Sequence, residues 1–198
     1  MAIGIESHKD ISGNFDIGLI GPGFKDDDWS KEVYRYITLN YSGVLIIDAG
    51  ALRLLEKKQV YDKKELILTP HPGEAGALLN ISTDEIQQNR EECAKAIANK
   101  YDAAAVVLKG YNTLVHIKDE DKTFLCKNGG PVLATGGTGD VLAGVICALL
   151  AQKLSLKDSC LLGVAAHAKA GESFVEDIGE IGLNASALIP IIRKILNK

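Results

Sequence analysis

A glycine-rich stretch that runs into a single acid offers the clearest chemistry in this sequence. Residues 134–151 read ATGGTGDVLAGVICALLA, so a loop with three glycines and two threonines leads through Asp140 into an apolar helix. Amides at the start of a helix lack partners within the helix and carry partial positive charge, so they attract anions such as phosphate. Asp140 is the predicted catalytic base, which would deprotonate a hydroxyl group that attacks a phosphoryl group. The predicted anion hole comprises Gly136, Gly137, Thr138 and Gly139.

Other interpretations of the same loop are weaker or do not fit. No Gly-Lys-Ser/Thr follows, which excludes a Walker A loop, and Leu142 stands where a dinucleotide fingerprint needs its third glycine. A carboxylate in the first turn also stabilises a helix by about 0.3–1 kcal/mol through the helix dipole, so Asp140 has a purely structural explanation as well. We favour the catalytic interpretation because a buried helix is a rigid support for a base.

Further polar side chains come directly after predicted strands. The segments LTPHPGEAGALL (68–79) and VLKGYNTLV (107–115) each place several such groups where an apolar strand ends. Ligands of open α/β sheets bind at the carboxyl ends of the strands, so we expect these groups to lie around one site. The candidates are Thr69, His71, Glu74, Lys109, Gly110 and Thr113, with Asp48 and the GPG at 21–23 closing two more strands.

Hydrophobic periodicity predicts the elements that must position these groups. Strands alternate with helices, which indicates one α/β domain over 1–198 with a mainly parallel sheet. The predicted strands are IGLI (17–20), VLIIDAG (44–50), ELIL (65–68) and AAAVVLKG (103–110), followed by a hairpin of TLVHIK (113–118) and KTFLCK (122–127). The first predicted helix begins at a cap at Ser30 and ends at Tyr41, and the second follows the HPGE turn. A single helix is predicted over 82–101, and its buried stripe comprises Ile86, Cys93, Ala96 and Ile97. The remaining predicted helices are 138–151, 157–176 and 185–196.

Composition narrows the class of protein. The 198 residues are 46% hydrophobic, enough for the core of one domain, and the net charge is −4 with the lysines and arginines scattered along the chain. No basic stripe is present in the sequence, so neither nucleic acid nor an anionic membrane is an expected partner. The four cysteines are widely spaced without a CxxC pair, which indicates free thiols in a cytoplasmic protein. Cys147 and Cys160 lie in apolar helical segments and are predicted to be buried.

A family resemblance rests on four segments in order: GPG, LTPHPGE, LKGYNTLV and GGTGDVLAGVICALLAQ, with AAHAKAGE (165–172) after them. They resemble the ADP- or ATP-dependent NAD(P)H-hydrate dehydratases of the ribokinase-like superfamily, from about residue 17 to the C-terminus. The resemblance implies a ribokinase-like three-layer α/β/α sandwich and an enzyme that restores NADH and NADPH from their hydrates, NAD(P)HX. The implied chemistry is phosphorylation of the hydroxyl at C6 of the hydrated nicotinamide, then loss of phosphate, which leaves more readily than hydroxide.

The resemblance also implies roles for individual residues. Gly23, His71 and Asp140 would contact the hydrated substrate, and ADP or ATP would be the phosphoryl donor together with Mg²⁺. Glu74 is the candidate Mg²⁺ ligand, because the matching glutamate helps to position the metal in related kinases. His167 lies in an alanine-rich helix and is expected to pack rather than to catalyse. The implied contacts of the adenine nucleotide are Lys109, Gly110, Tyr111, Asn112, Thr113 and Gly139.

Two departures from the family pattern affect these expectations. DAGAL (48–52) carries Gly50 where family members commonly have a second aspartate. The family domain also normally begins with additional β–α units that we do not find here, and without them a hydrophobic sheet edge would be uncovered. We therefore expect a partial domain whose N-terminal units are missing, or a homo-oligomer or second chain that completes the fold.

Simpler explanations and two other functions remain open at this point. His71 between two prolines also suits a turn residue, and Lys109 a solvated strand end. Glu74 also suits a first-turn acid of a helix, and Asp48 a cap of the turn after its strand. A ribokinase-like kinase for a thiazole or pyrimidine alcohol is one alternative function, although such kinases typically carry Asn at the position of His71 and lack the Pro-Gly of HPGE. The other is a non-catalytic nucleotide-binding homologue that retains the fold without turnover.

Overall fold

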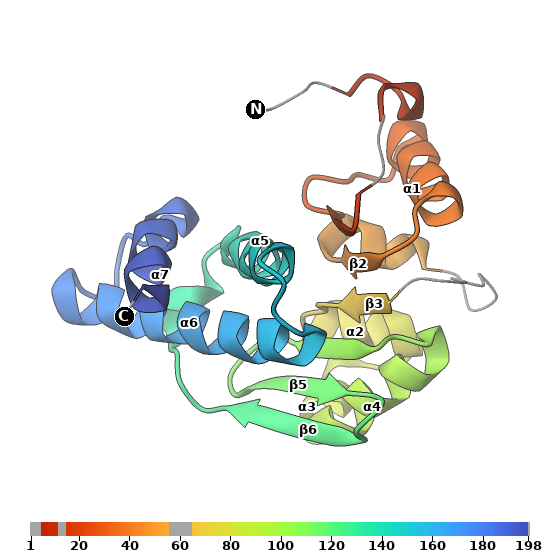
Figure 1. Ribbon diagram of the computed structural model, residues 1–198. Coiled ribbons are helices and arrows are strands. Elements are labelled where there is room, and N and C mark those ends of the chain that lie inside the picture. The colour runs from red at the N-terminus through yellow and green to blue at the C-terminus, as the bar shows by residue number, and fades with distance from the viewer. Residues whose placement is uncertain (1–4, 12–14, 56–64, 198) are drawn as a thin grey trace.

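The centre of the computed structural model is a six-stranded sheet whose strands lie side by side in chain order (Figure 1). The structure describes residues 5–11, 15–55 and 65–197. Strands β1 to β4 pair in parallel, whereas β4, β5 and β6 form an antiparallel meander. The mainly parallel sheet and the hairpin are therefore confirmed. The strands are β1 (Ile17–Ile20), β2 (Val44–Ile47), β3 (Glu65–Leu68), β4 (Ala105–Leu108), β5 (Thr113–Ile117) and β6 (Lys122–Cys126).

The interior strands are continuously apolar because both faces of the sheet are covered. Leu45, Ile46 and Ile47 of β2 are fully buried. The register pairs Ile47 with Leu68 and Leu68 with Val106, so β2, β3 and β4 run in step across the sheet. The residues that follow these three strands consequently meet at one edge.

Helices complete the outer layers. They are α1 (Asp28–Asn40), α2 (Pro72–Leu79), α3 (Thr83–Gln88), α4 (Arg90–Tyr101), α5 (Thr138–Ala151), α6 (Leu156–Asp177) and α7 (Leu188–Leu196). One buried cluster joins Leu68 of the sheet to Ile86 of α3 and Ile97 of α4, and a second joins the other face to α5 and α6. Helix α7 packs against α6. This arrangement confirms the three-layer α/β/α sandwich.

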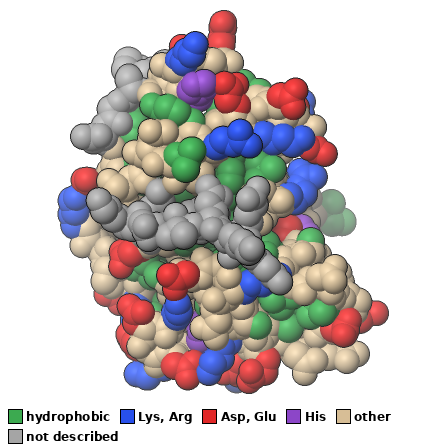
Figure 2. Space-filling model, turned by 90° about the vertical axis from the view of Figure 1, so that its right-hand side faces the viewer, with side chains coloured by type: hydrophobic (Ala, Val, Ile, Leu, Met, Phe, Trp, Pro, Cys, Tyr) green, Lys and Arg blue, Asp and Glu red, His purple; other side chains and the backbone are tan. Residues whose placement is uncertain are grey.

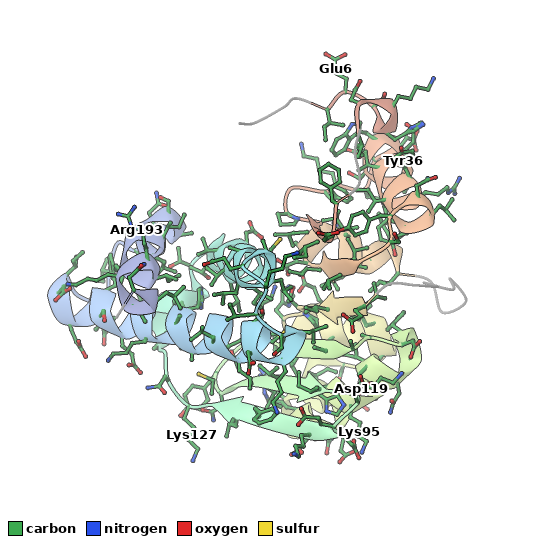
Figure 3. All side chains as sticks on the ribbon, viewed as in Figure 1. Glu6, Tyr36, Lys95, Asp119, Lys127 and Arg193 are labelled. Carbon is green, nitrogen blue, oxygen red and sulfur yellow. The ribbon has the colours of Figure 1, made fainter. Side chains whose placement is uncertain are left out.

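Side chains fill the space between the sheet and its helices (Figure 3). The labelled side chains of Lys95, Lys127 and Arg193 point outward from this packed interior. On the face shown in Figure 2, basic and acidic side chains are interspersed. Within the part of the chain that the structure describes, no helix is both long enough and apolar enough to cross a membrane.

Two helix predictions were wrong in detail. Helix α1 begins at Asp28 and is capped by Asp27, whose side chain accepts a hydrogen bond from the Ser30 amide at 2.8 Å, so Ser30 is not the cap but a buried residue of the first turn. The single helix predicted over 82–101 is two helices, because Asn89 leaves helical geometry at φ −132° and ψ 45°.

The buried stripe of α3 and α4 differs from the predicted one at a single position. Ile86, Cys93 and Ile97 are buried as predicted, but Ala96 is exposed. The buried alanines of α4 are Ala94 and Ala98 instead. The buried face of α4 thus runs through two adjacent pairs, 93–94 and 97–98, and Ala96 lies off that face.

The cysteines are free thiols within the described residues. Cys93 and Cys160 are buried, and burial raises the pKa of the Cys160 thiol to about 12, which makes it an inert core side chain. Cys147 is only half-buried, so its predicted burial is met in part. The neighbouring Ala148 is exposed, which shows that this side of α5 reaches the surface.

Two glycines allow a test of how tightly α5 packs on α6. A Cβ at Gly163 of α6 would lie 2.7 Å from Ile146 Cγ1, whereas a Cβ at Gly144 of α5 would meet no atom within 4 Å. Alanine improves helix propensity at both sites, so this gain cancels in a comparison. We expect the free energy of unfolding of Gly163→Ala to lie about 1–3 kcal/mol below that of Gly144→Ala, measured by urea denaturation, because of overpacking. Equal stabilities would mean that the helices separate freely.

Candidate active site

A cavity of about 610 Å³ opens among the segments that follow β2, β3 and β4. Its size lies in the range of small-molecule sites, about 300–1,000 Å³. Gly23 and Gly136 do not line this cavity, although Gly23 belongs to the turn that follows β1. The predicted site residues that do line it are His71, Glu74, Lys109, Gly110, Tyr111, Asn112, Thr113, Gly137, Thr138, Gly139 and Asp140.

The glycine loop turns the chain sharply into α5. Gly137 is the N-cap residue with φ +87°, a left-handed conformation that glycine adopts without steric cost. The Thr138 hydroxyl donates to the carbonyls of Leu133 and Thr135 at 2.6 and 2.8 Å, and the Thr138 amide also donates to Thr135. Thr138 therefore ties the loop together from within.

The amides best placed for an anion come just after Thr138. The first helical hydrogen bond joins the Val141 amide to the Gly137 carbonyl at 3.1 Å. The amides of Gly139 and Asp140 precede it, in the part of a helix whose N–H groups have no helical partner. Since Gly139 and Asp140 also line the cavity, this helix start presents partial positive charge to it.

Asp140 has an environment that suits a base. Burial raises the pKa of its carboxyl group, the charge of Asp48 raises it further, and Lys109 acts in the opposite direction. A carboxylate with a raised pKa accepts a proton more readily than an ordinary one. Because the pKa is raised in the folded state, the ionised form destabilises the fold above that pKa, and this penalty disappears as the pH falls through it.

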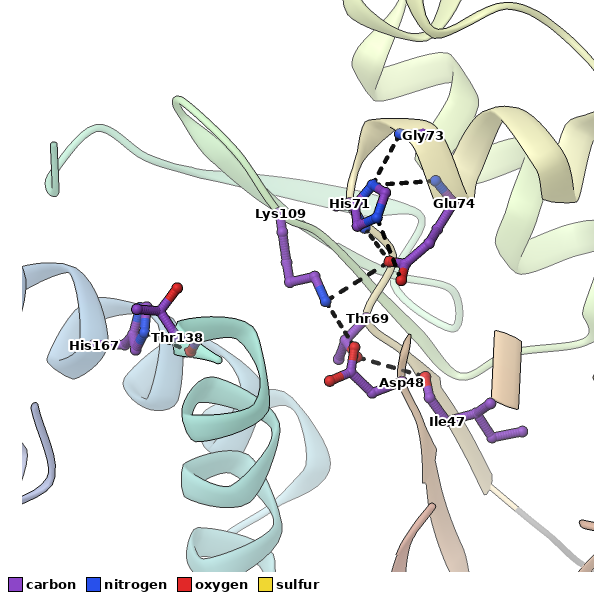
Figure 4. Close-up of polar contacts among 9 residues, drawn as sticks. All are labelled: Ile47, Asp48, Thr69, His71, Gly73, Glu74, Lys109, Thr138 and His167. Carbon is purple, nitrogen blue, oxygen red and sulfur yellow. Dashed lines mark hydrogen bonds and ion pairs between the residues drawn. The ribbon is translucent and has the colours of Figure 1, made fainter. Parts of the chain in front are cut away.

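A largely buried ion pair joins Lys109 of the cavity wall to Asp48 behind it. Lys109 Nζ is 2.7 Å from Asp48 Oδ1, and the same oxygen accepts a hydrogen bond of 2.8 Å from the Thr69 hydroxyl (Figure 4). The Asp48 side chain is fully buried and that of Lys109 is 16% exposed. Glu74 Oε2 lies 3.8 Å from the same ammonium group. Lys109 is thus a fixed cation at the cavity wall and not a solvated strand end.

The sequence did not assign this role to Asp48. Its side chain makes no capping hydrogen bond to the short helix that follows, η2 (Ala49–Leu54), so an explanation as a turn cap does not hold. A signal was present in retrospect, because an acid and a lysine each end an apolar strand. The sheet order that makes them neighbours was not available from the sequence.

Gly139 gives Lys109 room. A Cβ at this position would lie 3.2 Å from Lys109 Nζ, which is closer than ordinary van der Waals contact. A side chain here would push the ammonium group away from the start of α5. The glycine therefore keeps a cation and a helix start together, both attractive to phosphate.

His71 and Glu74 form a capping box at the start of α2. His71 Nδ1 accepts hydrogen bonds from the amides of Gly73 and Glu74 at 3.0 and 3.2 Å, and Glu74 Oε2 accepts one from the His71 amide at 2.7 Å (Figure 4). His71 is a turn residue, as its flanking prolines suggested, and its half-exposed ring also lines the cavity. With Nδ1 as acceptor, neutral His71 carries its proton on Nε2, 3.4 Å from Glu74 Oε1.

His167 supports the glycine loop from α6. Its ring is buried, and Nε2 lies 2.9 Å from the Thr138 carbonyl. Burial lowers the pKa of His167, so the neutral ring donates from Nε2 to that carbonyl. His167 packs as the sequence suggested, and it also lines the cavity.

The side chains fit a metal ion that arrives with phosphate better than a resident one. Across residues 5–11, 15–55 and 65–197, no group of three or more His, Cys, Asp or Glu side chains is arranged to hold a metal. Mg²⁺ typically binds through one or two carboxylates together with substrate phosphates and water. Glu74, a carboxylate at the cavity wall, is compatible with that mode.

The fold and the cavity together define a ribokinase-like α/β protein. Ribokinase of Thermotoga maritima superimposes with a TM-score of 0.61 at 17% identity, over 92% of this chain and 56% of that one, a likeness of fold alone. The sequence then identifies the family. A family model described as NAD(P)H-hydrate dehydratase matches residues 4–194, and the chain belongs to that family. The resemblance carried by the motifs is confirmed.

Two relatives have informative names. The bifunctional NAD(P)H-hydrate repair enzyme Nnr of Coxiella burnetii is 41% identical over 180 residues, which are 90% of this chain and 36% of that protein. An ADP/ATP-dependent NAD(P)H-hydrate dehydratase from Bacillus subtilis, crystallised with ATP/Mg²⁺, has a TM-score of 0.84 at 29% identity, over 96% of this chain and 68% of that one. The chain spans about a third of the length of the bifunctional repair enzymes that it matches.

The buried ion pair makes a prediction about stability. Lys109→Met would leave Asp48 buried without its cation, which typically costs about 3–5 kcal/mol. We expect Lys109→Met combined with Asp48→Asn to unfold at a higher urea concentration than Lys109→Met alone, because the uncompensated charge is gone. Lys157→Met, which breaks the more exposed pair with Glu120, serves as control and should cost at most about 1 kcal/mol. Additive effects of Lys109→Met and Asp48→Asn would contradict the coupling.

Proposed function

We propose that this protein uses ADP or ATP to dehydrate NADH hydrate or NADPH hydrate, which restores the dihydronicotinamide. The observation that carries this proposal is the cavity where Asp140, the start of α5 and Lys109 meet, in a chain of the NAD(P)H-hydrate dehydratase family. The Bacillus subtilis relative that was crystallised with ATP/Mg²⁺ supports both the nucleotide and the cation.

The proposed chemistry has two steps. Asp140 takes the proton of the hydroxyl at C6 of the hydrated ring, whose oxygen attacks the terminal phosphorus of the nucleotide while the bond to the leaving nucleotide oxygen breaks. The lone pair of the ring nitrogen then expels the C6 phosphate, and loss of a proton from the neighbouring carbon restores the double bond. The raised pKa of Asp140 favours the first proton transfer.

The chain's own groups divide the remaining tasks. The amides of Gly139 and Asp140 and the ammonium of Lys109 would stabilise negative charge on the moving phosphoryl group. We assign the turn 109–113 to the nucleotide, and His71 and the Gly23 turn to the hydrated ring. When Mg²⁺ is bound with the nucleotide it neutralises phosphate charge, and Glu74 is the carboxylate we assign to it.

One experiment separates this function from its two rivals. The protein is incubated with NADH hydrate and either ADP or ATP with Mg²⁺, and the dihydronicotinamide absorbance is followed. We expect recovery of absorbance that requires the nucleotide. Phosphorylation of a thiazole or pyrimidine alcohol without recovery would favour the kinase, and nucleotide binding without any turnover would favour the non-catalytic homologue.

Asp140→Asn tests the base within the same assay. Removing a general base should lower kcat at least about 100-fold. Because the ionised carboxylate destabilises the fold at neutral pH, we expect no loss of thermal stability in this variant. Asp158→Asn is the matched control, since Asp158 is a first-turn acid of α6 outside the cavity lining, and it should retain activity. Equal activity of Asp140→Asn and wild type would remove Asp140 from its assigned role.

We also propose that residues 1–198 form one ribokinase-like domain, or part of one, and that a second copy or another chain covers the edge of its sheet. In the described residues β1 pairs with β2 alone, and Ile17, Gly18 and Leu19 are half-buried. A strand edge of this kind presents unpaired N–H and C=O groups, which proteins usually cover. Light scattering during size-exclusion chromatography should then report an assembly larger than a monomer. A monodisperse and fully active monomer would contradict this proposal.

A further inference from the structure

Arg90 makes an unusual set of contacts outside the cavity lining. It is the first residue of α4, directly after the break at Asn89, and its guanidinium reaches the tight turn between β4 and β5. Arg90 Nη2 donates to the carbonyls of Leu108, Lys109 and Asn112 at 3.0, 3.3 and 3.4 Å. A single side chain thus binds carbonyl groups at both ends of the turn that we assign to the nucleotide.

The hydrogen-bond partners of the Arg90 guanidinium are uncharged oxygen atoms. Its fourth partner is the side-chain oxygen of Gln87, which accepts from Nη1 at 2.9 Å. The guanidinium is partly buried, and burial lowers the pKa of Arg90. Removing an ionised group from water is costly unless its donors are satisfied. The main-chain carbonyls of the turn supply that compensation for Nη2, and Gln87 supplies it for Nη1, whereas Nε is buried without a partner among the described residues. The turn and the guanidinium therefore stabilise each other through the terminal nitrogens.

The turn depends on two residues with positive φ, so its conformation is specific and an anchor can hold it in place. Gly110 has φ +129° and Asn112 has φ +57°, on either side of Tyr111, a residue that is 85% exposed. The Thr113 hydroxyl donates to the Gly110 carbonyl at 2.9 Å, and the Lys109 amide donates to the Pro70 carbonyl at 2.9 Å. Arg90 completes this set of anchors and is the one that comes from a helix.

Packing around Gly110 links the anchor to the cavity wall. A Cβ at Gly110 would lie 3.4 Å from Arg90 Nη1 and 3.8 Å from Pro72 Cγ, so the guanidinium packs directly beneath the backbone of the turn. All five residues of the turn, 109–113, line the cavity. Displacement of the guanidinium would therefore be transmitted to the cavity-lining backbone of 110–113, whereas the ammonium group of Lys109 is held separately by Asp48.

We propose that Arg90 is a positioning residue for the nucleotide: its guanidinium holds the 109–113 turn in the conformation that binds ADP or ATP, without touching the nucleotide itself. This inference rests on the proposed function only in assigning the turn to the nucleotide. A rigid, preformed turn loses little conformational entropy when the nucleotide binds. Loss of the Arg90 guanidinium should therefore weaken nucleotide binding and leave the chemical step intact.

The test compares Arg90→Met and Arg90→Lys with Gln87→Ala. Binding of ADP and of ATP with Mg²⁺ is measured by calorimetry, kcat at saturating nucleotide by the absorbance assay, and folding by thermal unfolding. For Arg90→Met we expect the Kd for nucleotide to rise about tenfold or more, with kcat within about twofold of wild type. Arg90→Lys should show a smaller rise, because an ammonium keeps the charge but lacks the planar fork.

Gln87→Ala is the matched control, since it removes the contact of Nη1 and leaves all three carbonyl contacts in place. Its Kd should stay within about twofold of wild type. Hydrogen exchange of the amides in the 109–113 turn should accelerate in Arg90→Met and not in Gln87→Ala. This readout separates a local effect on the turn from general destabilisation.

The outcomes test the role of Arg90 separately from the proposed dehydration reaction. Unchanged nucleotide Kd in a folded Arg90→Met protein would overturn it, and so would a loss of kcat at unchanged Kd. If the wild type binds ADP but restores no dihydronicotinamide, the proposed reaction fails while the Kd values still decide the role of Arg90. If the wild type binds neither nucleotide, both proposals fall.

Discussion

The contact between Lys109 and Asp48 is the constraint on which the candidate site depends. It joins the ends of β4 and β2 across β3, and the hydroxyl of Thr69, which follows β3, donates to the same aspartate oxygen. The cation of this pair is held beside Gly139, at the start of α5, and the anion adds to the electrostatic environment that raises the pKa of Asp140. One buried pair thus holds a cation at the cavity wall and contributes to the pKa of Asp140 at the same time.

The cavity around this pair is built mostly from backbone and short side chains. Two turns with positive φ, at Gly137 and at Gly110, bring main-chain groups to its surface. Longer side chains behind these turns hold them: His167 donates to the carbonyl of Thr138, and Arg90 to three carbonyls of the 109–113 turn. Both turns are therefore held by side chains from other elements, and of these two His167 also lines the cavity whereas Arg90 does not.

Much of the site was predictable because its signals are local. A glycine loop before an apolar helix predicts an anion-binding helix start, and continuous apolar runs such as VLIIDAG predict the buried strands. The pairing of Asp48 with Lys109 was not predictable, since it depends on the order of strands in the sheet. The break at Asn89 escaped notice because Ile86, Cys93 and Ile97 keep a helical spacing across it. Arg90 carries no sequence signal, because its partners are carbonyl groups that every residue has.

The distance along the chain between the two partners of the central ion pair has a thermodynamic consequence. Asp48 and Lys109 are 61 residues apart in sequence, and Asp140 lies further still from Asp48. No fragment that folds locally can assemble these groups, so the cavity exists only when the sheet and α5 are in place together. A molecule that occupies it binds the native state alone, and by mass action its concentration then sets how often the whole polypeptide unfolds.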